Sequence, residues 1–360
     1  MRDGRGLPPQ VEGKRGQGLL FRLAIGNDSL QGPIRDAHYG LQLQDTAISG
    51  VTNEADFTIQ YEEIAGAYPD GTPYSLRQPT YTLINTSGAP INIKEVSPRV
   101  ANHIIGMGLL EAIAEDTLRS LADEQDADGD GISGRPNYVW SVETQSTAIG
   151  RFGWKANQPT VRQQVASAFA GDMGITSSLF PNENCPPSVD CATLPNGGDP
   201  EISDDDLMKI VLYASALAVP AQRGWEKEKV QRGKALFVEA KCTSCHIPQI
   251  KTGEHPYIKG FSNQTIRPYT DLLLHDMGEG LADHANDFLA NGREWRTPPL
   301  WGIGLFEMVN GHTYYLHDGR ARNLEEAILW HDGEAQASKT AFMEMTATER
   351  EQLIAFLNSL

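Results

Sequence analysis

The run Cys242-Thr243-Ser244-Cys245-His246 constrains this chain more than any other feature of its sequence. In a C-x-x-C-H run, two thiols on one helical turn can form thioethers with the haem vinyl groups, while the adjacent imidazole reaches the iron. The sequence therefore predicts that Cys242 and Cys245 attach haem c covalently and that His246 is the proximal iron ligand. Such a chain has to fold around a large planar cofactor.

Two other kinds of site also use a C-x-x-C pair. A structural zinc site needs two more ligands with similar spacing, and none is evident; a thioredoxin-like redox pair is expected within a βαβ pattern. The flanks favour haem. Residues 233–237 predict a helix that leads into the motif, with Phe237 placed to pack on the porphyrin, and Pro248 is expected to stop the helix.

Composition excludes some classes of partner. The net charge of −17 argues against an extended nucleic-acid footprint and favours a basic partner. No apolar run of 18 residues occurs, so no membrane span is expected. Residues 1–9 lack an apolar signal region, although covalent haem attachment normally takes place outside the cytoplasm. We therefore expect a periplasmic protein whose export signal is missing from this chain.

Helical periodicity predominates along the chain and predicts a mainly α fold, with two cytochrome c-like domains and short antiparallel β excursions. We expect an N-terminal domain over 1–175, a Pro- and Gly-rich linker over 176–202 and a C-terminal domain over 203–360. The β excursion is predicted at 58–61 and 80–84, around turn residues 69–73. Helices are predicted at 108–121 (one or two), 160–170, 203–218 and 348–357.

A candidate calcium loop begins at Asp126. Asp126, Asp128 and Asp130 occupy positions one, three and five, and Gly131 occupies position six. Position twelve is Asn137 instead of a bidentate Glu, so the loop is not a regular EF-hand. A structural calcium ion and a solvated acidic turn both remain open.

The other two cysteines form a second local pair. Cys185 and Cys191 flank five residues in a Pro- and Asn-rich loop. This spacing permits a disulfide-closed turn, which an oxidising compartment would stabilise. The sequence predicts that disulfide if the protein is exported.

The sixth iron position has two candidate ligands. Met277 would raise the reduction potential towards that of an electron carrier, whereas His331, near the end of a predicted helix, would give a lower potential. From the residues alone both assignments stay open.

Several segments together carry a resemblance to a known family: 126–137, 150–156, 242–248, 268–278, 295–301 and 317–331. They resemble bacterial di-haem oxidoreductases named as thiol oxidoreductases, which are similar to di-haem cytochrome c peroxidases and to the tryptophan-modifying MauG enzyme. In the peroxidases the distal ligand follows a His-x-Gly turn by fourteen residues, as His331 follows His317 here. The resemblance thus implies His331 as distal ligand, while Met277 falls in a segment bordering the haem. Trp154 matches the aromatic between the two haems, with a buried core Trp as the alternative.

The resemblance also shows one departure. Family members carry a first C-x-x-C-H just before a segment like residues 2–8, so we expect the first attachment site either upstream of Met1 or lost in a one-haem remnant. The resemblance implies a haem oxidoreductase that transfers electrons through a six-coordinate haem. A di-haem peroxidase, or a non-enzymatic electron-transfer cytochrome, is the alternative. The expected partner is a redox protein or a small-molecule electron donor.

Overall fold

A computed structural model of the chain describes residues 19–23, 25–45, 52–86, 88, 91–92, 96–183 and 196–360. Helices make up 31% of the structure and strands 22%, with several small antiparallel sheets. The expectation of a mainly α fold is therefore wrong. Cys185 and Cys191 lie outside the described residues, and their disulfide stays a prediction, as does the division into domains.

The largest β element is a hairpin of β5 (Ala55–Ala67) and β6 (Pro73–Asn85). The two strands pair antiparallel along their whole length, from Ala55 with Asn85 to Ala67 with Pro73. At the turn, the Thr72 N–H donates to the carboxylate of Asp70. The predicted β excursion is confirmed, but each strand is 13 residues long instead of four or five.

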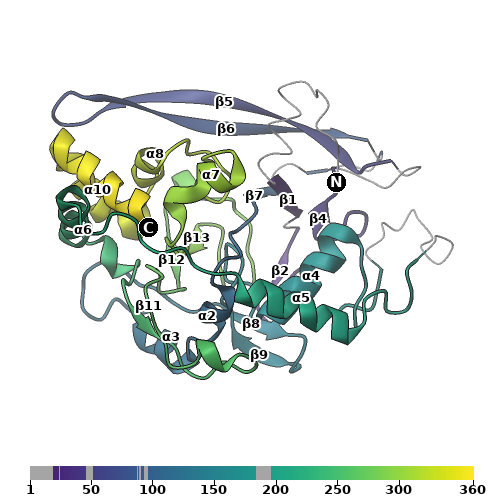
Figure 1. Cartoon of the computed structure of the whole chain (residues 1–360). Coiled ribbons are helices and arrows are strands. Elements are labelled where there is room, and N and C mark those ends of the chain that lie inside the picture. The colour runs from purple at the N-terminus through teal and green to yellow at the C-terminus, as the bar shows by residue number, and fades with distance from the viewer. Residues whose placement is uncertain are drawn as a thin grey trace.

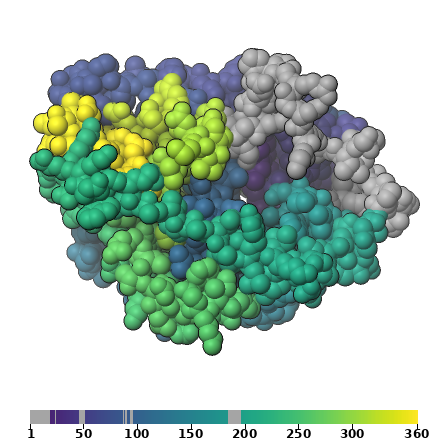
Figure 2. Space-filling view, in the orientation of Figure 1, coloured from purple at the N-terminus to yellow at the C-terminus, as the bar shows by residue number. Residues whose placement is uncertain are grey.

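This hairpin crosses the molecule above α8 (Leu324–Leu329) and α10 (Ala347–Ser359) (Figure 1). Figure 2 shows it along the upper edge, above the yellow α10. Its turn is fastened to both helices: the Tyr68 hydroxyl donates to Glu325 at 2.5 Å, and Arg350 pairs with Asp70 at 2.8 Å. Further along, Arg77 donates to the carbonyls of the 319–320 turn. The hairpin thus packs on helices that follow it by more than two hundred residues.

The remaining sheets are small. A three-stranded antiparallel sheet has the order β4–β1–β7, formed by Gln42–Leu43, Leu19–Leu23 and Val96–Val100. The other strands form two-stranded antiparallel pairs: β2 (Asn27–Asp28) with β3 (Gly32–Pro33), β8 (Tyr138–Ser141) with β9 (Ser146–Ile149), β10 (Ile250–Lys251) with β11 (Thr265–Ile266), and β12 (Leu274–Asp276) with β13 (Glu294–Arg296).

The helices between residues 107 and 216 follow the sequence pattern closely. The 108–121 region forms two helices, α2 (Met107–Glu111) and α3 (Glu115–Leu121). Helix α4 (Val161–Ala168) continues as a π-helical turn over Phe169–Met173. The Ser203 hydroxyl accepts from the Asp206 N–H and caps α5 (Asp204–Ala216), as predicted.

In the second half, α6 (Glu228–Glu239) packs against α10 at close range. A Cβ at Gly233 would lie 1.9 Å from the Gln352 carbonyl oxygen, so only glycine permits this approach. A capping box between Thr346 and Glu349 starts α10, which confirms the predicted C-terminal helix. The other helices are α7 (Phe306–Asn310) and α9 (Gln336–Glu344), and the 3-10 turns are η4 (Cys242–Ser244), η5 (Lys259–Phe261), η6 (Glu279–Leu281), η7 (Ile303–Leu305) and η8 (Gly333–Ala335).

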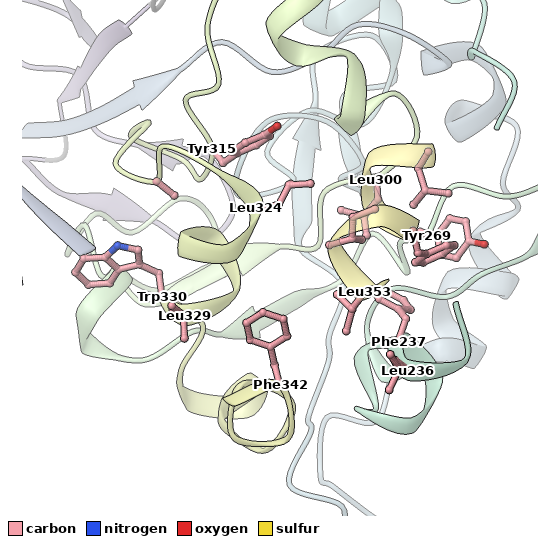
Figure 3. Close-up of a cluster of buried hydrophobic side chains, with 14 of the residues drawn as sticks. Leu236, Phe237, Tyr269, Leu300, Tyr315, Leu324, Leu329, Trp330, Phe342 and Leu353 are labelled. Carbon is pink, nitrogen blue, oxygen red and sulfur yellow. The ribbon is translucent and has the colours of Figure 1, made fainter. Parts of the chain in front are cut away.

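These helices enclose an apolar cluster that is drawn in Figure 3. Phe237 comes from α6, Leu324 and Leu329 from α8, Phe342 from α9 and Leu353 from α10. In the part of the chain that the structure describes, no helix is long and apolar enough to span a membrane.

Candidate functional site

A cavity of about 1110 Å³ lies next to this apolar cluster. Its wall includes Cys242, Cys245, His246, Met277 and His331, which come from three separate segments of the chain. The structure thus brings every residue predicted to attach or ligate haem to one cavity. The volume exceeds the roughly 300–1,000 Å³ typical of small-molecule and cofactor sites.

The two cysteines of the motif are free thiols on the cavity wall. Cys242 begins the 3-10 turn η4, and the preceding Lys241 has a left-handed φ of 58° that turns the chain out of α6. Burial raises the pKa of Cys242 to about 12 and also raises the pKa of Cys245. A redox-active cysteine needs a lowered pKa, so these neutral thiols do not resemble a thioredoxin-like pair.

Both candidate axial histidines are held in the same way. Nδ1 of His246 lies 2.8 Å from the Tyr269 carbonyl oxygen, and Nδ1 of His331 lies 2.7 Å from the Ala327 carbonyl oxygen. Because a carbonyl oxygen only accepts hydrogen bonds, the proton of each neutral ring belongs on Nδ1. The lone pair of each Nε2 is then free to bind a metal.

The surroundings of the two imidazoles lower the pKa of both. Burial lowers the pKa of His246 to about 4, although its hydrogen bond to Tyr269 opposes the shift, and the nearby His331 lowers it further. Burial likewise lowers the pKa of His331. Both rings are therefore neutral near pH 7. Met277 lines the same cavity.

The cavity wall around these residues is mostly apolar. Phe237, with its ring centroid 6.1 Å from that of His246, lines the cavity together with Leu300, Leu324 and Leu353, which belong to the cluster in Figure 3. The sequence predicted that Phe237 packs on the porphyrin, and the structure places its ring beside His246 on the cavity wall. Such a wall suits a porphyrin and keeps water away from the iron position.

The cavity continues into the first half of the chain. There its wall includes Leu20 and Arg22 of β1, Arg99 of β7, and Phe152 and Trp154. The indole Nε1 of Trp154 donates to a backbone carbonyl at 2.7 Å, and the rest of the side chain faces the cavity. We call the part of the cavity that these first-half residues line the first-half lobe; the C-x-x-C-H motif lines another part of the same cavity.

The candidate calcium loop differs in detail from the prediction. Potential ligand oxygens of Asp123, Asp126 and Asp128 lie within 4.8 Å of one another, whereas Asp130 lies outside this group and accepts from the Ile132 N–H. Asp123 lies before the loop pattern begins, so EF-hand register could not identify it. Of the predicted trio, the structure brings Asp126 and Asp128 together.

Sequence inspection missed a buried ionic triad beside the motif. Nε2 of His275 lies 2.8 Å from Asp271, and its Nδ1 lies 2.6 Å from Glu334 and 3.6 Å from the Cys245 sulfur. Burial alone would lower the pKa of His275, but the two carboxylates hold it well above its usual value. Potential ligand atoms of Cys245, Asp271 and His275 also lie within 4.8 Å of one another, close enough to hold one metal ion. Both nitrogens of His275 are already engaged by carboxylates, and Cys242 is not in this group, which argues against a zinc site built on the C-x-x-C pair.

Comparison with known proteins gives one match. Residues 38–360 match the model of a family described as "Di-haem oxidoreductase, putative peroxidase". No curated protein and no solved structure matches the chain significantly. The matched range includes both candidate axial histidines, the C-x-x-C-H motif and most of the first-half lobe.

Proposed function

Because the chain belongs to the di-haem oxidoreductase family, we propose that it transfers electrons through a haem c that Cys242 and Cys245 attach and that His246 and His331 ligate. The single observation that carries this proposal is the pair of neutral imidazoles on one cavity, each with Nδ1 held by a backbone carbonyl. Haem bound there supplies one-electron redox chemistry, and two imidazole ligands favour a low reduction potential.

The chain's own residues have distinct parts in this function. The carbonyls of Tyr269 and Ala327 fix the tautomer and the orientation of the two rings. The apolar wall with Phe237 and Leu353 excludes water and so favours outer-sphere electron transfer. With both axial positions filled, no position is left for peroxide at this site.

A second candidate function is peroxidase activity, which the family description names. The observation that favours it is the first-half lobe, whose wall carries Trp154 and three arginines, Arg22, Arg35 and Arg99. A second haem in that lobe would provide the open iron position that the first lacks. Peroxide turnover should then depend on occupancy of the first-half lobe.

We further propose a periplasmic location, because covalent haem attachment takes place outside the cytoplasm, and a basic redox protein or a small molecule as electron donor. The net charge of −17 supports a basic protein partner, since opposite charge steers association.

The decisive experiment is maturation of the chain in a host with a cytochrome c maturation system, behind an added export signal. Intact-mass analysis should show one covalent haem at this motif, and the absorption spectrum should be that of low-spin haem. Cys242→Ala should leave a single thioether at most, while Ser244→Ala, within the same run, should retain double attachment. A chain that carries zinc, or no haem adduct, would refute the proposal.

A further inference from the structure

The side chain of Glu334 binds the turn that follows the proposed distal ligand to two other segments of the protein. Glu334 lies in η8, three residues after His331, and its side chain is only 11% exposed. Its Oε2 lies 2.6 Å from Nδ1 of His275 and accepts from the Ser133 N–H at 3.0 Å. Its Oε1 accepts from the Ser133 hydroxyl and from the Asp276 N–H, both at 3.1 Å. Both oxygens are thus bound by donors from two other segments.

These contacts matter because the segment carrying His331 has little support of its own. Helix α8 has only six residues, too short to be stable without tertiary packing. Beyond its C-terminal end, the His331 N–H donates to Ile328 and its ring to Ala327, so both bonds stay within this short element. After His331, Glu334 is the next charged residue whose side chain bonds to another part of the chain.

The turn also lies directly on β12. A Cβ at Gly333, where φ is +56°, would lie 2.3 Å from the Asp276 carbonyl oxygen, and a Cβ at Gly278 would lie 2.9 Å from the Asp332 side chain. The residues that the turn contacts are Asp276, the last residue of β12, and Gly278, two residues further on. They flank Met277, which is the other candidate ligand. Movement of this turn therefore alters the positions of both candidates relative to the iron.

We propose that Glu334 is a positioning residue that keeps His331 at the iron by tying the turn after α8 to Ser133, His275 and Asp276. This inference rests on the proposed function, since it presupposes haem between His246 and His331. Loss of the carboxylate frees the turn, so His331 dissociates more often and exogenous ligands reach the iron. Met277, the residue that follows β12, becomes the competing axial ligand.

The test uses the matured full chain with covalent haem. Three variants remove progressively more of the anchor: Ser133→Ala removes one hydroxyl donor, Glu334→Gln removes the charge, and Glu334→Ala removes all the contacts. The matched control is Glu344→Ala in α9, because that side chain is exposed. Intact mass and far-UV circular dichroism establish haem loading and folding before any other measurement.

The readouts are the low-spin fraction, the reduction potential and the rate at which carbon monoxide binds the ferrous protein. Glu334→Ala should speed carbon monoxide binding on the order of tenfold, the effect expected from losing a charge-assisted hydrogen bond. It should also raise the potential and the high-spin fraction. Ser133→Ala should change the same quantities in the same direction by less, and Glu344→Ala should match wild type.

Two results would overturn the inference. One is an unchanged spin state, potential and binding rate in folded, haem-loaded Glu334→Ala. If Glu334→Ala does not fold, an unchanged spin state, potential and binding rate in both Glu334→Gln and Ser133→Ala would overturn the inference as well. The proposed function fails separately, if wild type takes up no covalent haem or if its spectrum is unaffected by His331→Ala.

Discussion

Trp295 lies flat against His317, with ring centroids 3.9 Å apart and an interplanar angle of 14°. Nζ of Lys155 is 4.1 Å from the centroid of the same indole ring. Both aromatic side chains line the cavity, whereas Lys155 is fully buried and pairs with Asp283 at 3.1 Å. A buried cation thus supports the aromatic wall of the cavity, and its protonation affects the stability of the fold.

The first prediction concerns this lysine. Burial lowers the pKa of Lys155 from 10.5 to about 8, against the opposing attraction of Asp283. Between these two values the unfolded chain binds more protons than the folded one, so the free energy of unfolding should rise with pH across that window. Lys155→Met should remove a rise of up to about 3 kcal/mol, at roughly 1.36 kcal/mol for each pKa unit. Urea unfolding of both proteins between pH 7.5 and 10 measures it, and parallel stability curves would contradict it.

The second prediction assigns the sixth iron ligand. His331→Ala should open a coordination position and convert low-spin haem into high-spin haem, because the imidazoles of His331 and His246 line one cavity and each has Nδ1 bound to a carbonyl. Met277→Ala should leave the bis-imidazole spectrum largely intact. Magnetic circular dichroism in the near infrared distinguishes the two ligand sets. If the effects were exchanged, Met277 would be the ligand and the reduction potential would be higher.

The third prediction concerns the acidic loop. Asp123, Asp126 and Asp128 repel one another without a cation, so bound calcium should raise the melting temperature. By linkage, calcium at a hundred times its dissociation constant stabilises the folded state by about 2.7 kcal/mol. Asp123→Asn should abolish most of the shift between calcium and chelator, whereas Asp130→Asn should retain it. Equal melting temperatures for wild type in calcium and in chelator would rule out a stabilising ion here.

The fourth prediction tests the attachment of the β5–β6 hairpin. Tyr68→Phe removes the hydroxyl that donates to Glu325, and bonds to charged groups contribute about 1.5–3 kcal/mol. We expect a loss of stability of that size in urea unfolding. Glu62→Gln, at an exposed position on the same hairpin, should have little effect. Equal losses in the two variants would show that the Tyr68 contact is not what holds the hairpin.

The sequence predicted local features well. The Ser203 cap, the C-terminal helix and the turn at Asp70 depend on neighbouring residues, and all are present. The length of the hairpin strands was not predictable, because the end of β5 near the turn is largely exposed and its alternation of buried and exposed residues disappears there. The β content was therefore underestimated, because most of the hairpin and several strands of only two or three residues were missed. For this reason the sequence predicted a mainly α fold.

In the candidate site, too, local features were predictable and distant contacts were not. The C-x-x-C-H run and the two candidate distal ligands could be named from short spacings, and the structure places them on one cavity. Glu334 and Lys155 could not be named, since their partners Ser133 and Asp283 are more than a hundred residues away in sequence. No local pattern marks a residue whose role depends on such distant contacts.

The hairpin has a further consequence for how the protein is made. Its partners Glu325, Arg322 and Arg350 follow it by 257, 259 and 280 residues. During synthesis the hairpin therefore emerges long before the helices that it will cover, and both of its edges are unpaired in the meantime. Contacts between such distant segments form slowly. The packing of the β5–β6 hairpin over α8 should thus be among the last contacts of the protein to form, once α10 has left the ribosome.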